Sequence, residues 1–336
     1  MAKRVLLKDI AAKVGVSTAL VSYVMNGLEK EKRVGADVVI RIREVARELD
    51  YKPNQIAQSL RRGTTQTLGV ILADISNPFF GHLARVIEDE AGKLGYTVIF
   101  GSSDEDAIKS DKLIQAFSDR QVDGFIVVPA ENSALQIKKL FETGTPLVQI
   151  DRCYKDIESN YVGLDNFNAS FHAVTALIRN GRKRIAMIAY RSSLNHMEER
   201  IAGYREAMMT FGLQDKICII ELDYAGYLEE TDRYMQELIN VEEPADGLFF
   251  ATNSISIVGL YWIKRNKIRV PEDVAIIGFD GNEAFDFFYA PLSFVEQPIV
   301  EMGQEAVRLI VEQIKGNTVL SQIRLKENLV LRESCS

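Results

Sequence analysis

The stretch that decides how this chain is organised is residues 6–27, which read LLKDIAAKVGVSTALVSYVMNG. In its first half Ile10, Ala11 and Val14 recur at helical spacing and form one apolar stripe. Gly15 comes next, and glycine readily adopts the positive φ that a tight turn needs. The first half of the stretch therefore predicts a short amphipathic helix that ends in a turn.

The second half of the stretch predicts another helix. Ser17 is a suitable N-cap, and Val21, Val24 and Met25 are spaced to face the first helix. Two helices joined in this way form a helix-turn-helix, which places its second helix in the major groove of DNA; a hairpin of an unrelated fold is the alternative. The residues then available to base edges and phosphates are Ser17, Thr18, Ala19, Ser22, Tyr23 and Asn26.

A family resemblance begins beyond a third amphipathic stretch, residues 37–49. Residues 51–63 read YKPNQIAQSLRRG, and their Pro-Asn-x-x-Ala-x-x-Leu pattern resembles the hinge segment of the lactose-repressor family of bacterial transcription regulators. Each further motif is weak alone, but together they follow the family's order along nearly the whole chain: residues 74–80 (DISNPFF), 122–124 (VDG), 163–166 (GLDN), 200–204 (RIAGY), 270–274 (VPEDV) and 278–280 (GFD).

The resemblance implies a homodimer that binds a pseudo-palindromic operator in double-stranded DNA. Tyr23 stands where several family members have arginine, so their operator sequences are not carried over. The third helix begins without hydroxyl groups, which makes Arg33 a further candidate for a phosphate contact. No leucine heptads follow the last expected strand, which favours a dimer over a tetramer. The hinge residues expected on DNA are Asn54, Ala57, Leu60 and Arg61, with Leu60 as the wedge that kinks the minor groove.

The distribution of charge agrees with a DNA-binding amino-terminal part. Residues 1–63 hold 13 lysines and arginines against 7 acidic residues, whereas residues 64–336 hold 27 against 40. The overall charge of −7 is therefore the sum of a basic segment with a net charge of +6 and an acidic remainder with a net charge of −13. A local phosphate-binding module needs such a concentration of positive charge.

Composition indicates an intracellular globular protein. The chain is 47% hydrophobic and 26% charged, which is ordinary for a soluble protein of two or three domains. Cys153, Cys218 and Cys335 are scattered and form no C-x-x-C pair, so we expect reduced thiols and neither disulfides nor metal ligands. No export signal or membrane span is recognisable, and we expect a cytoplasmic location.

Beyond residue 67 the pattern changes to short β-rich runs that alternate with helical stretches. The first series is expected at residues 68–73, 96–100, 124–128 and 146–150, and the second at 161–164, 184–188, 216–220, 247–250 and 274–278. Such alternation predicts an α/β fold of doubly wound parallel sheets with helices on both faces. The core is thus expected to consist of two similar lobes, as in periplasmic sugar-binding proteins.

The resulting domain plan has three parts. Residues 1–52 form an all-α helix-turn-helix headpiece, residues 53–66 a hinge with a hinge helix, and residues 67–336 the effector-binding and dimerisation core. Within the core, the first lobe spans about 67–162 and 296–325, and the second about 163–295 and 326–336. The chain would cross between lobes near 161–163, near 293–297 and near 325, and ligands bind outside the carboxyl ends of such strands.

Candidate effector-binding residues follow the expected strands or match family positions. Phe79 and Phe80 could stack on a sugar or base, although either could be ordinary core packing. Arg200 occupies a position that in the family contributes an effector-binding arginine, whose planar fork could bridge two oxygens. Asp74, Asn253 and Asp280 could pair with hydroxyls, and Arg152 and Tyr224 are candidates by position. These groups favour a carbohydrate or nucleoside-like effector over a lipid.

Nothing in the sequence supports an enzyme. His82, His172 and His196 stand in expected helical contexts without a nucleophile or a paired carboxylate motif. Only His196 could reach the cleft, and we expect it to be a solvated surface residue. No catalytic residue, cofactor or metal is expected, and the rival interpretations are an exported solute-binding protein and a sugar-active enzyme on the same core.

Overall fold

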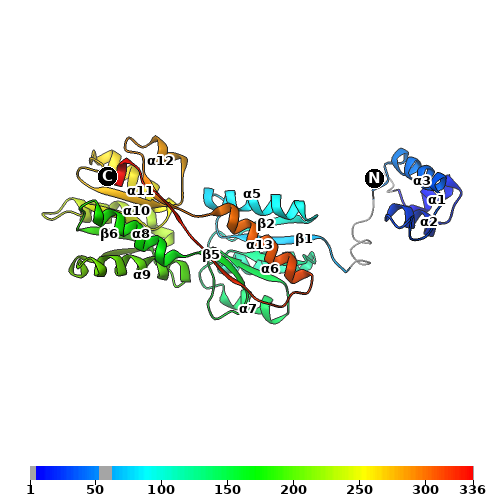
Figure 1. Cartoon of the computed structure of the whole chain (residues 1–336), viewed down its shortest axis with the longest axis horizontal. Coiled ribbons are helices and arrows are strands. Elements are labelled where there is room, and N and C mark those ends of the chain that lie inside the picture. Colours follow the sequence, from blue (N-terminus) through cyan, green and yellow to red (C-terminus); the bar gives the residue numbers. More distant parts are fainter. Residues whose placement is uncertain (1–4, 53–62, 336) are drawn as a thin grey trace. The chain divides into compact units, whose positions relative to one another are not determined.

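The computed structural model describes residues 5–52 and 63–335. The expected hinge residues Asn54, Ala57, Leu60 and Arg61 lie outside the described residues. The chain divides into two compact units, Met1–Thr65 and Gln66–Ser336 (Figure 1).

The amino-terminal unit is the expected helix-turn-helix followed by a third helix. Its helices are α1 (Leu7–Val14), α2 (Thr18–Met25) and α3 (Ala36–Glu48). Gly15 ends α1 with a φ of 80°, and the side chain of Ser17 caps α2 by accepting a hydrogen bond from Leu20 N. Met25 is half-buried and packs against the core. That core consists of Ile10, Ala11, Val14, Val21, Val24, Val39, Ile42 and Ala46.

The second unit contains two six-stranded sheets of matching order. The first runs β11-β5-β4-β3-β1-β2 and is wholly parallel; the second runs β12-β10-β9-β8-β6-β7 and is parallel except for β12. The first sheet comprises β1 (Thr67–Leu72), β2 (Thr97–Ser102), β3 (Gly124–Val127), β4 (Leu147–Ile150), β5 (Asn160–Leu164) and β11 (Gln322–Leu325). The second comprises β6 (Ile185–Tyr190), β7 (Cys218–Leu222), β8 (Gly247–Phe250), β9 (Ala275–Phe279), β10 (Ser293–Glu296) and β12 (Asn328–Val330).

Helices cover both faces of each sheet, as the apolar strands require (Figure 1). The first lobe consists of the first sheet with α5 (Pro78–Lys93) and α13 (Ile299–Ile314) on one face, and α6 (Ala107–Asp119) and α7 (Ala134–Glu142) on the other. The second lobe consists of the second sheet with α8 (Asn166–Arg179) and α9 (Asn195–Thr210) on one face, and α10 (Tyr227–Ile239) and α11 (Asn253–Asn266) on the other. The short helix α12 (Glu283–Phe287) belongs to the second lobe.

The first crossover comes slightly later than the strand pattern predicts. Residues 161–164 were expected in the second series, yet β5 pairs with β4 and β11 in the first sheet. The reason is that β5 is the last parallel strand added to the first sheet before the chain enters α8. The chain crosses again between β10 and α13 and between β11 and β12, which places three connections at one hinge.

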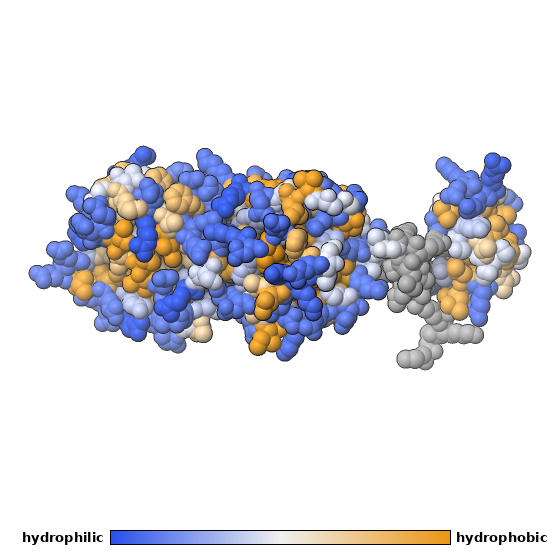
Figure 2. All heavy atoms as spheres, turned by 90° about the horizontal axis from the view of Figure 1, so that it is seen from below, coloured by the Kyte–Doolittle hydropathy of each residue, from blue (hydrophilic) through white to orange (hydrophobic). Residues whose placement is uncertain are grey.

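On the face drawn in Figure 2, hydrophilic residues cover most of the second unit and apolar residues form smaller patches between them. Within the described ranges 5–52 and 63–335, no helix has the length and apolar character needed to cross a membrane.

Candidate functional site

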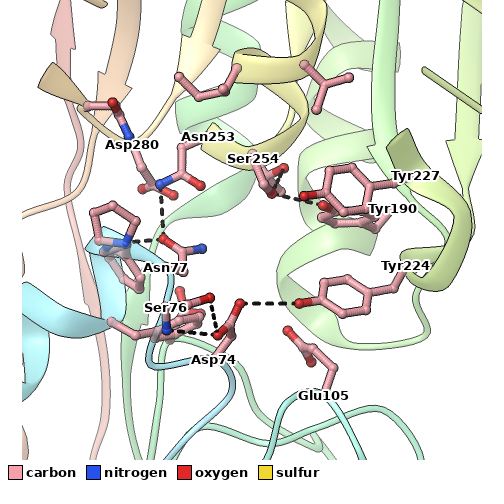
Figure 3. A pocket seen from close by; sticks show the side chains of 18 of the residues that line it. Asp74, Ser76, Asn77, Glu105, Tyr190, Tyr224, Tyr227, Asn253, Ser254 and Asp280 are labelled. Atoms are coloured by element: carbon pink, nitrogen blue, oxygen red, sulfur yellow. Dashed lines mark hydrogen bonds between the residues drawn. The ribbon is translucent and has the colours of Figure 1, made fainter. Parts of the chain in front are cut away.

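The carboxyl ends of both sheets face a cavity of about 380 Å³ between the two lobes. Its volume falls in the range of small-molecule sites, about 300–1,000 Å³. The structure brings all eight candidate effector residues to its wall: Asp74, Phe79, Phe80 and Arg152 from the first lobe, and Arg200, Tyr224, Asn253 and Asp280 from the second. Figure 3 labels Asp74, Tyr224, Asn253 and Asp280 among them.

The loop after β1 is held by side-chain hydrogen bonds. Asp74 Oδ1 accepts from Ser76 N at 2.8 Å and from Ser76 Oγ at 2.7 Å. Asn77 caps α5 by accepting from Phe79 N at 3.0 Å. Because these bonds fix the loop locally, Asp74 is presented to the cavity in one orientation.

Two hydrogen bonds join this loop to the second lobe across the cavity. Tyr224 Oη donates to Asp74 Oδ2 at 3.4 Å, and Asn253 Nδ2 donates to Asn77 Oδ1 at 3.0 Å (Figure 3). The structure is therefore a closed form, in which the lobes touch at the site itself.

Phe79 and Phe80 line the cavity and also pack in the hydrophobic core of the first lobe. They are 4% and 3% exposed, their rings meet edge to face at 5.0 Å, and both belong to the apolar cluster of the first lobe. Core packing thus accounts for most of each ring's surface. The Arg152 guanidinium lies 5.7 Å from the centroid of the Phe80 ring.

Arg152 forms a two-pronged ion pair within the first lobe. Its Nη1 and Nη2 donate to the two carboxylate oxygens of Glu105 at 2.7 and 2.8 Å. Burial lowers the pKa of Arg152, but the Glu105 and Asp151 carboxylates raise it further, so the net pKa lies above its ordinary value. Glu105, which lies in the loop between β2 and α6, was not among the residues predicted from the sequence.

Arg200 is held from three sides in the second lobe. Its Nε donates to Asn166 Oδ1 at 2.8 Å, its Nη1 donates to the carbonyl of Ala251 at 2.7 Å, and its guanidinium lies 3.5 Å from the Phe279 ring centroid. Burial lowers the pKa of Arg200 while Asp280 and Asp151 oppose the change. Within the described part of the chain, Nη2 has no hydrogen-bond partner.

Asp151 and Asp280 occupy equivalent places in the two lobes. Each follows the fourth strand of its series, with a φ of 66° at Asp151 and 61° at Asp280. Burial raises the pKa of Asp280 to about 6, and burial likewise raises that of Asp151. The amide of Gln297, on the crossover between β10 and α13, donates to Asp280 Oδ1 at 2.8 Å. Strained backbone at buried acids of a cleft is typical of functional sites.

The expectation for His196 was wrong. It is 5% exposed, it lines the cavity, and its Nδ1 has no partner among the described residues. Burial, with Arg152 and Arg200 nearby, lowers the pKa of His196 well below 6.5, so it is neutral near pH 7. The physical reason is that α9 starts at the carboxyl end of β6, which directs its first turn into the cleft.

Two further residues of the cavity wall, Tyr190 and Tyr227, were not predicted from the sequence. Tyr190 is the last residue of β6, so the rule that selected Asn253 after β8 would have found it. Tyr227 begins α10 beyond a short 3₁₀ turn, and no local pattern marks it.

The candidate DNA-contacting residues lie along α2 and its flanks. Ser17, Thr18 and Ala19 are exposed, whereas Ser22, Tyr23 and Asn26 are half-buried. Asn26 Nδ2 donates to the carbonyl of Ser22 at 2.5 Å, and Lys32 Nζ lies 5.9 Å from the centroid of the Tyr23 ring. Arg33 is exposed with a φ of 52°.

A basic helix-turn-helix joined to a two-lobed α/β core with a closed cleft defines a class of protein: DNA-binding regulators that respond to a small molecule. Comparison with known proteins identifies the family. Residues 6–54 match the model of bacterial regulatory proteins of the lacI family, and residues 174–335 match the periplasmic binding protein-like domain.

Three similar proteins illustrate the match. The transcriptional repressor CytR of Escherichia coli (strain K12) is 31% identical over 98% of this chain and 95% of its own. The structure of the transcriptional regulator CelR with cellobiose has a TM-score of 0.72 at 26% identity, covering 98% and 100% of the two chains. The lac repressor dimer bound to operator and the anti-inducer ONPF, at 22% identity, shares the fold with a TM-score of 0.86 over 99% of each chain.

The chain belongs to the lacI family of bacterial regulatory proteins. It is a DNA-binding transcription regulator under effector control and not an enzyme, as the sequence analysis expected. The interpretation as a sugar-active enzyme is thereby rejected.

Proposed function

We propose that this regulator is a cytoplasmic homodimeric repressor that binds a pseudo-palindromic operator, and that a small carbohydrate in the interlobe cavity changes its operator affinity. The observation that carries the proposal is the interlobe cavity whose wall holds Arg200, Asp280 and Asn253, in a chain that also has a basic headpiece. Aromatic faces and paired hydrogen-bonding groups suit a hydroxylated ring. A CelR structure with cellobiose supports the same class of effector.

The proposed DNA contacts divide by role. Thr18, Ala19, Ser22, Tyr23 and Asn26 meet base edges and the adjacent backbone from α2, with Ser17 capping the helix. Arg33 and Arg61 bind phosphates, and Asn54 and Ala57 place the hinge in the minor groove. Leu60 inserts between base pairs and kinks the duplex. In this scheme the headpiece is residues 1–52, the hinge 53–66 and the core 67–336.

The proposed switch is a shift between open and closed lobes. Asp74–Tyr224 and Asn77–Asn253 bridge the cleft directly, so a ligand that inserts there must replace or reinforce these contacts. A ligand that prefers one lobe arrangement shifts the population toward it. The resulting movement of one lobe against the other changes the spacing of the paired hinges, which couples the cavity to the operator.

The test begins with DNA and not with the effector. The full chain is used to select binding sites from a random duplex pool, and the enriched site is then titrated by fluorescence anisotropy with the unmodified chain and with Tyr23→Ala. We expect an enriched palindrome that the variant binds with altered base preference. A pool with no enriched sequence would contradict the proposal. Small carbohydrates are then screened for a shift in the melting temperature of the chain, and those that bind are tested for their effect on operator affinity.

A further inference from the structure

The charges on the cavity wall restrict the chemistry of the effector. The wall carries four carboxylates and two guanidinium groups, from Asp74, Glu105, Asp151, Asp280, Arg152 and Arg200. The one histidine on the wall, His196, is neutral near pH 7 because burial lowers its pKa. A phosphorylated ligand would therefore need an arginine whose donors are not already engaged by the protein.

Arg152 does not meet that need. Both of its terminal nitrogens donate to Glu105, at 2.7 and 2.8 Å. Its Nε is buried without a hydrogen-bond partner among the described residues, and it lies 3.5 Å from Asp151 Oδ2, so a second carboxylate already faces that edge of the guanidinium. Such a fork-to-fork pair satisfies the planar geometry that a phosphate would otherwise use. Both partners are largely buried, at 13% and 15% side-chain exposure, so separating them to admit an anion would leave Glu105 uncompensated.

Arg200 offers one nitrogen, Nη2, to a ligand, and acidic side chains line the same cavity. Asn166 and the carbonyl of Ala251 occupy Nε and Nη1, and the Phe279 ring covers one face of the guanidinium. Asp280 and Asp151 both act electrostatically on this arginine. Because the cavity wall carries four carboxylates against two guanidinium groups, an anion placed at Nη2 would meet unfavourable charge, whereas a neutral hydroxyl can accept from Arg200 and donate to a carboxylate of the wall.

The opposite end of the cavity is aromatic. Tyr190, Tyr224 and Tyr227 form a cluster with ring centroids 5.3 to 6.2 Å apart, and Leu228 and Tyr261 also line the cavity. Figure 3 shows the three tyrosines together on one side of the pocket and Asp280 and Asn253 on the other. A single sugar ring bound at Arg200 and Asp280 would leave this aromatic wall without a partner.

We infer that the effector is an uncharged glycoside of two rings, whose hydroxylated ring binds Arg200 and Asp280 and whose second ring stacks on the cluster of Tyr190, Tyr224 and Tyr227, and that phosphorylated ligands are excluded. The inference rests on the proposed function, since it names the ligand of the same cavity. A disaccharide, an aryl glycoside and a nucleoside all share this chemistry.

The test is calorimetric titration of the full chain with matched compounds. Each set contains a neutral two-ring glycoside, its single sugar and its phosphorylated counterpart, and separate disaccharide, aryl glycoside and nucleoside sets identify the source of the second ring. We expect one neutral two-ring compound to bind about tenfold or more tightly than both of its counterparts. Equal or tighter binding of a phosphorylated compound or of a single sugar overturns the inference, as does binding of no neutral two-ring compound.

Two variants test the reasons for this selectivity. Glu105→Gln releases the Arg152 fork, so the preference for the neutral over the phosphorylated compound should fall about tenfold. Tyr227→Ala should reduce the preference for the two-ring compound over its single sugar. The exposed Asp119→Asn, on α6 of the same lobe, is the matched control and should change neither ratio. An unchanged ratio in folded Glu105→Gln contradicts the role given to Glu105.

The two proposals fail separately. Operator affinity of the ligand-free chain is measured in parallel, and sequence-selective DNA binding with the wrong ligand preference overturns only the inference about the effector. Loss of sequence-selective DNA binding overturns the proposed function. The unmodified chain alone decides the ligand class, so the inference does not depend on the folding of any variant.

Discussion

At the scale of single residues, Asp280 is a cavity residue whose buried carboxylate lowers the stability of the folded protein at neutral pH. Its side chain is buried, its backbone is in the left-handed region, its Oδ1 accepts from Gln297, and the residue lines the interlobe cavity together with Arg200. Burial raises the pKa of Asp280 to about 6 from 3.8. Between these values the folded state holds a proton that the unfolded state has released, so the free energy of unfolding falls as the pH rises from about 4 to 6.

Asp280→Asn should therefore stabilise the protein at neutral pH. The amide resembles the protonated acid and still accepts from Gln297, so we expect a gain of up to about 3 kcal/mol at pH 7 and a flatter stability profile between pH 4 and 6. Urea unfolding at several pH values measures both, with the exposed Asp215→Asn as control. Equal stability of Asp280→Asn and the unmodified chain at pH 7 would show that Asp280 is not strained by burial.

At the scale of elements, the recognition helix α2 depends on its cap. Ser17 Oγ accepts from Leu20 N at 3.2 Å, and the helix has only eight residues. Ser17→Ala should destabilise α2 by about 1 kcal/mol, whereas Ser17→Asn should retain the cap. Hydrogen exchange of the α2 amides measures the difference, and equal protection in both variants would refute a capping role.

The outer face of α2 should specify sequence, while the hinge arginine should not. Tyr23→Ala is expected to lose about 1–3 kcal/mol at particular half-site positions, because a specific base contact is removed. Arg61→Ala should weaken binding to all sequences about equally and reduce the dependence of affinity on salt. Anisotropy titrations on single-substituted operators at several salt concentrations separate the two. A uniform loss for Tyr23→Ala would make it a phosphate contact.

Part of the site was predictable because several of its residues directly follow the strands of a parallel sheet. Asp74, Asn253 and Asp280 follow parallel strands, whose carboxyl ends must meet at one edge of a sheet. Glu105 and Gln297 could not be found in this way. Glu105 acts through Arg152, 47 residues away, and Gln297 reaches Asp280 only because a crossover returns past the cleft. Such contacts depend on tertiary folding and carry no local periodicity.

At the scale of the whole molecule, contacts away from the cavity also hold the lobes together. In the loop before α7, Glu131 accepts from Ser192 Oγ at 2.7 Å, from Ser193 N at 3.2 Å and from Ser193 Oγ. The two serines belong to the second lobe, and neither they nor Glu131 line the cavity. These bonds therefore bias closure without touching a ligand.

Glu131→Ala should weaken effector binding from a distance. Losing carboxylate hydrogen bonds that join the two lobes should shift the lobes toward opening by about 1 kcal/mol, which lowers apparent effector affinity by up to about fivefold. The exposed Glu142→Ala in the same lobe is the control. Calorimetry measures affinity and small-angle scattering measures compactness; unchanged affinity would show that these bonds do not set the closed population.

The final prediction separates the two ends of the proposed switch. Arg200 reaches the interlobe cavity from the second lobe and is far along the chain from the hinge that contains Leu60. Replacing Arg200 should therefore leave operator binding intact, and replacing Leu60 should leave effector binding intact. Arg200→Ala deletes a buried, charge-assisted donor and should weaken effector affinity about ten- to a hundredfold while ligand-free operator affinity is retained. Leu60→Ala should lower operator affinity and leave effector affinity unchanged. Calorimetry with the effector and anisotropy with the operator test both variants, and an Arg200→Ala protein with unaltered effector affinity would remove Arg200 from the site. If Leu60→Ala instead lost effector affinity in the absence of DNA, the hinge and the cavity would be coupled in the free protein. That result would contradict the proposed switch, in which only the spacing of the lobes links the operator to the effector.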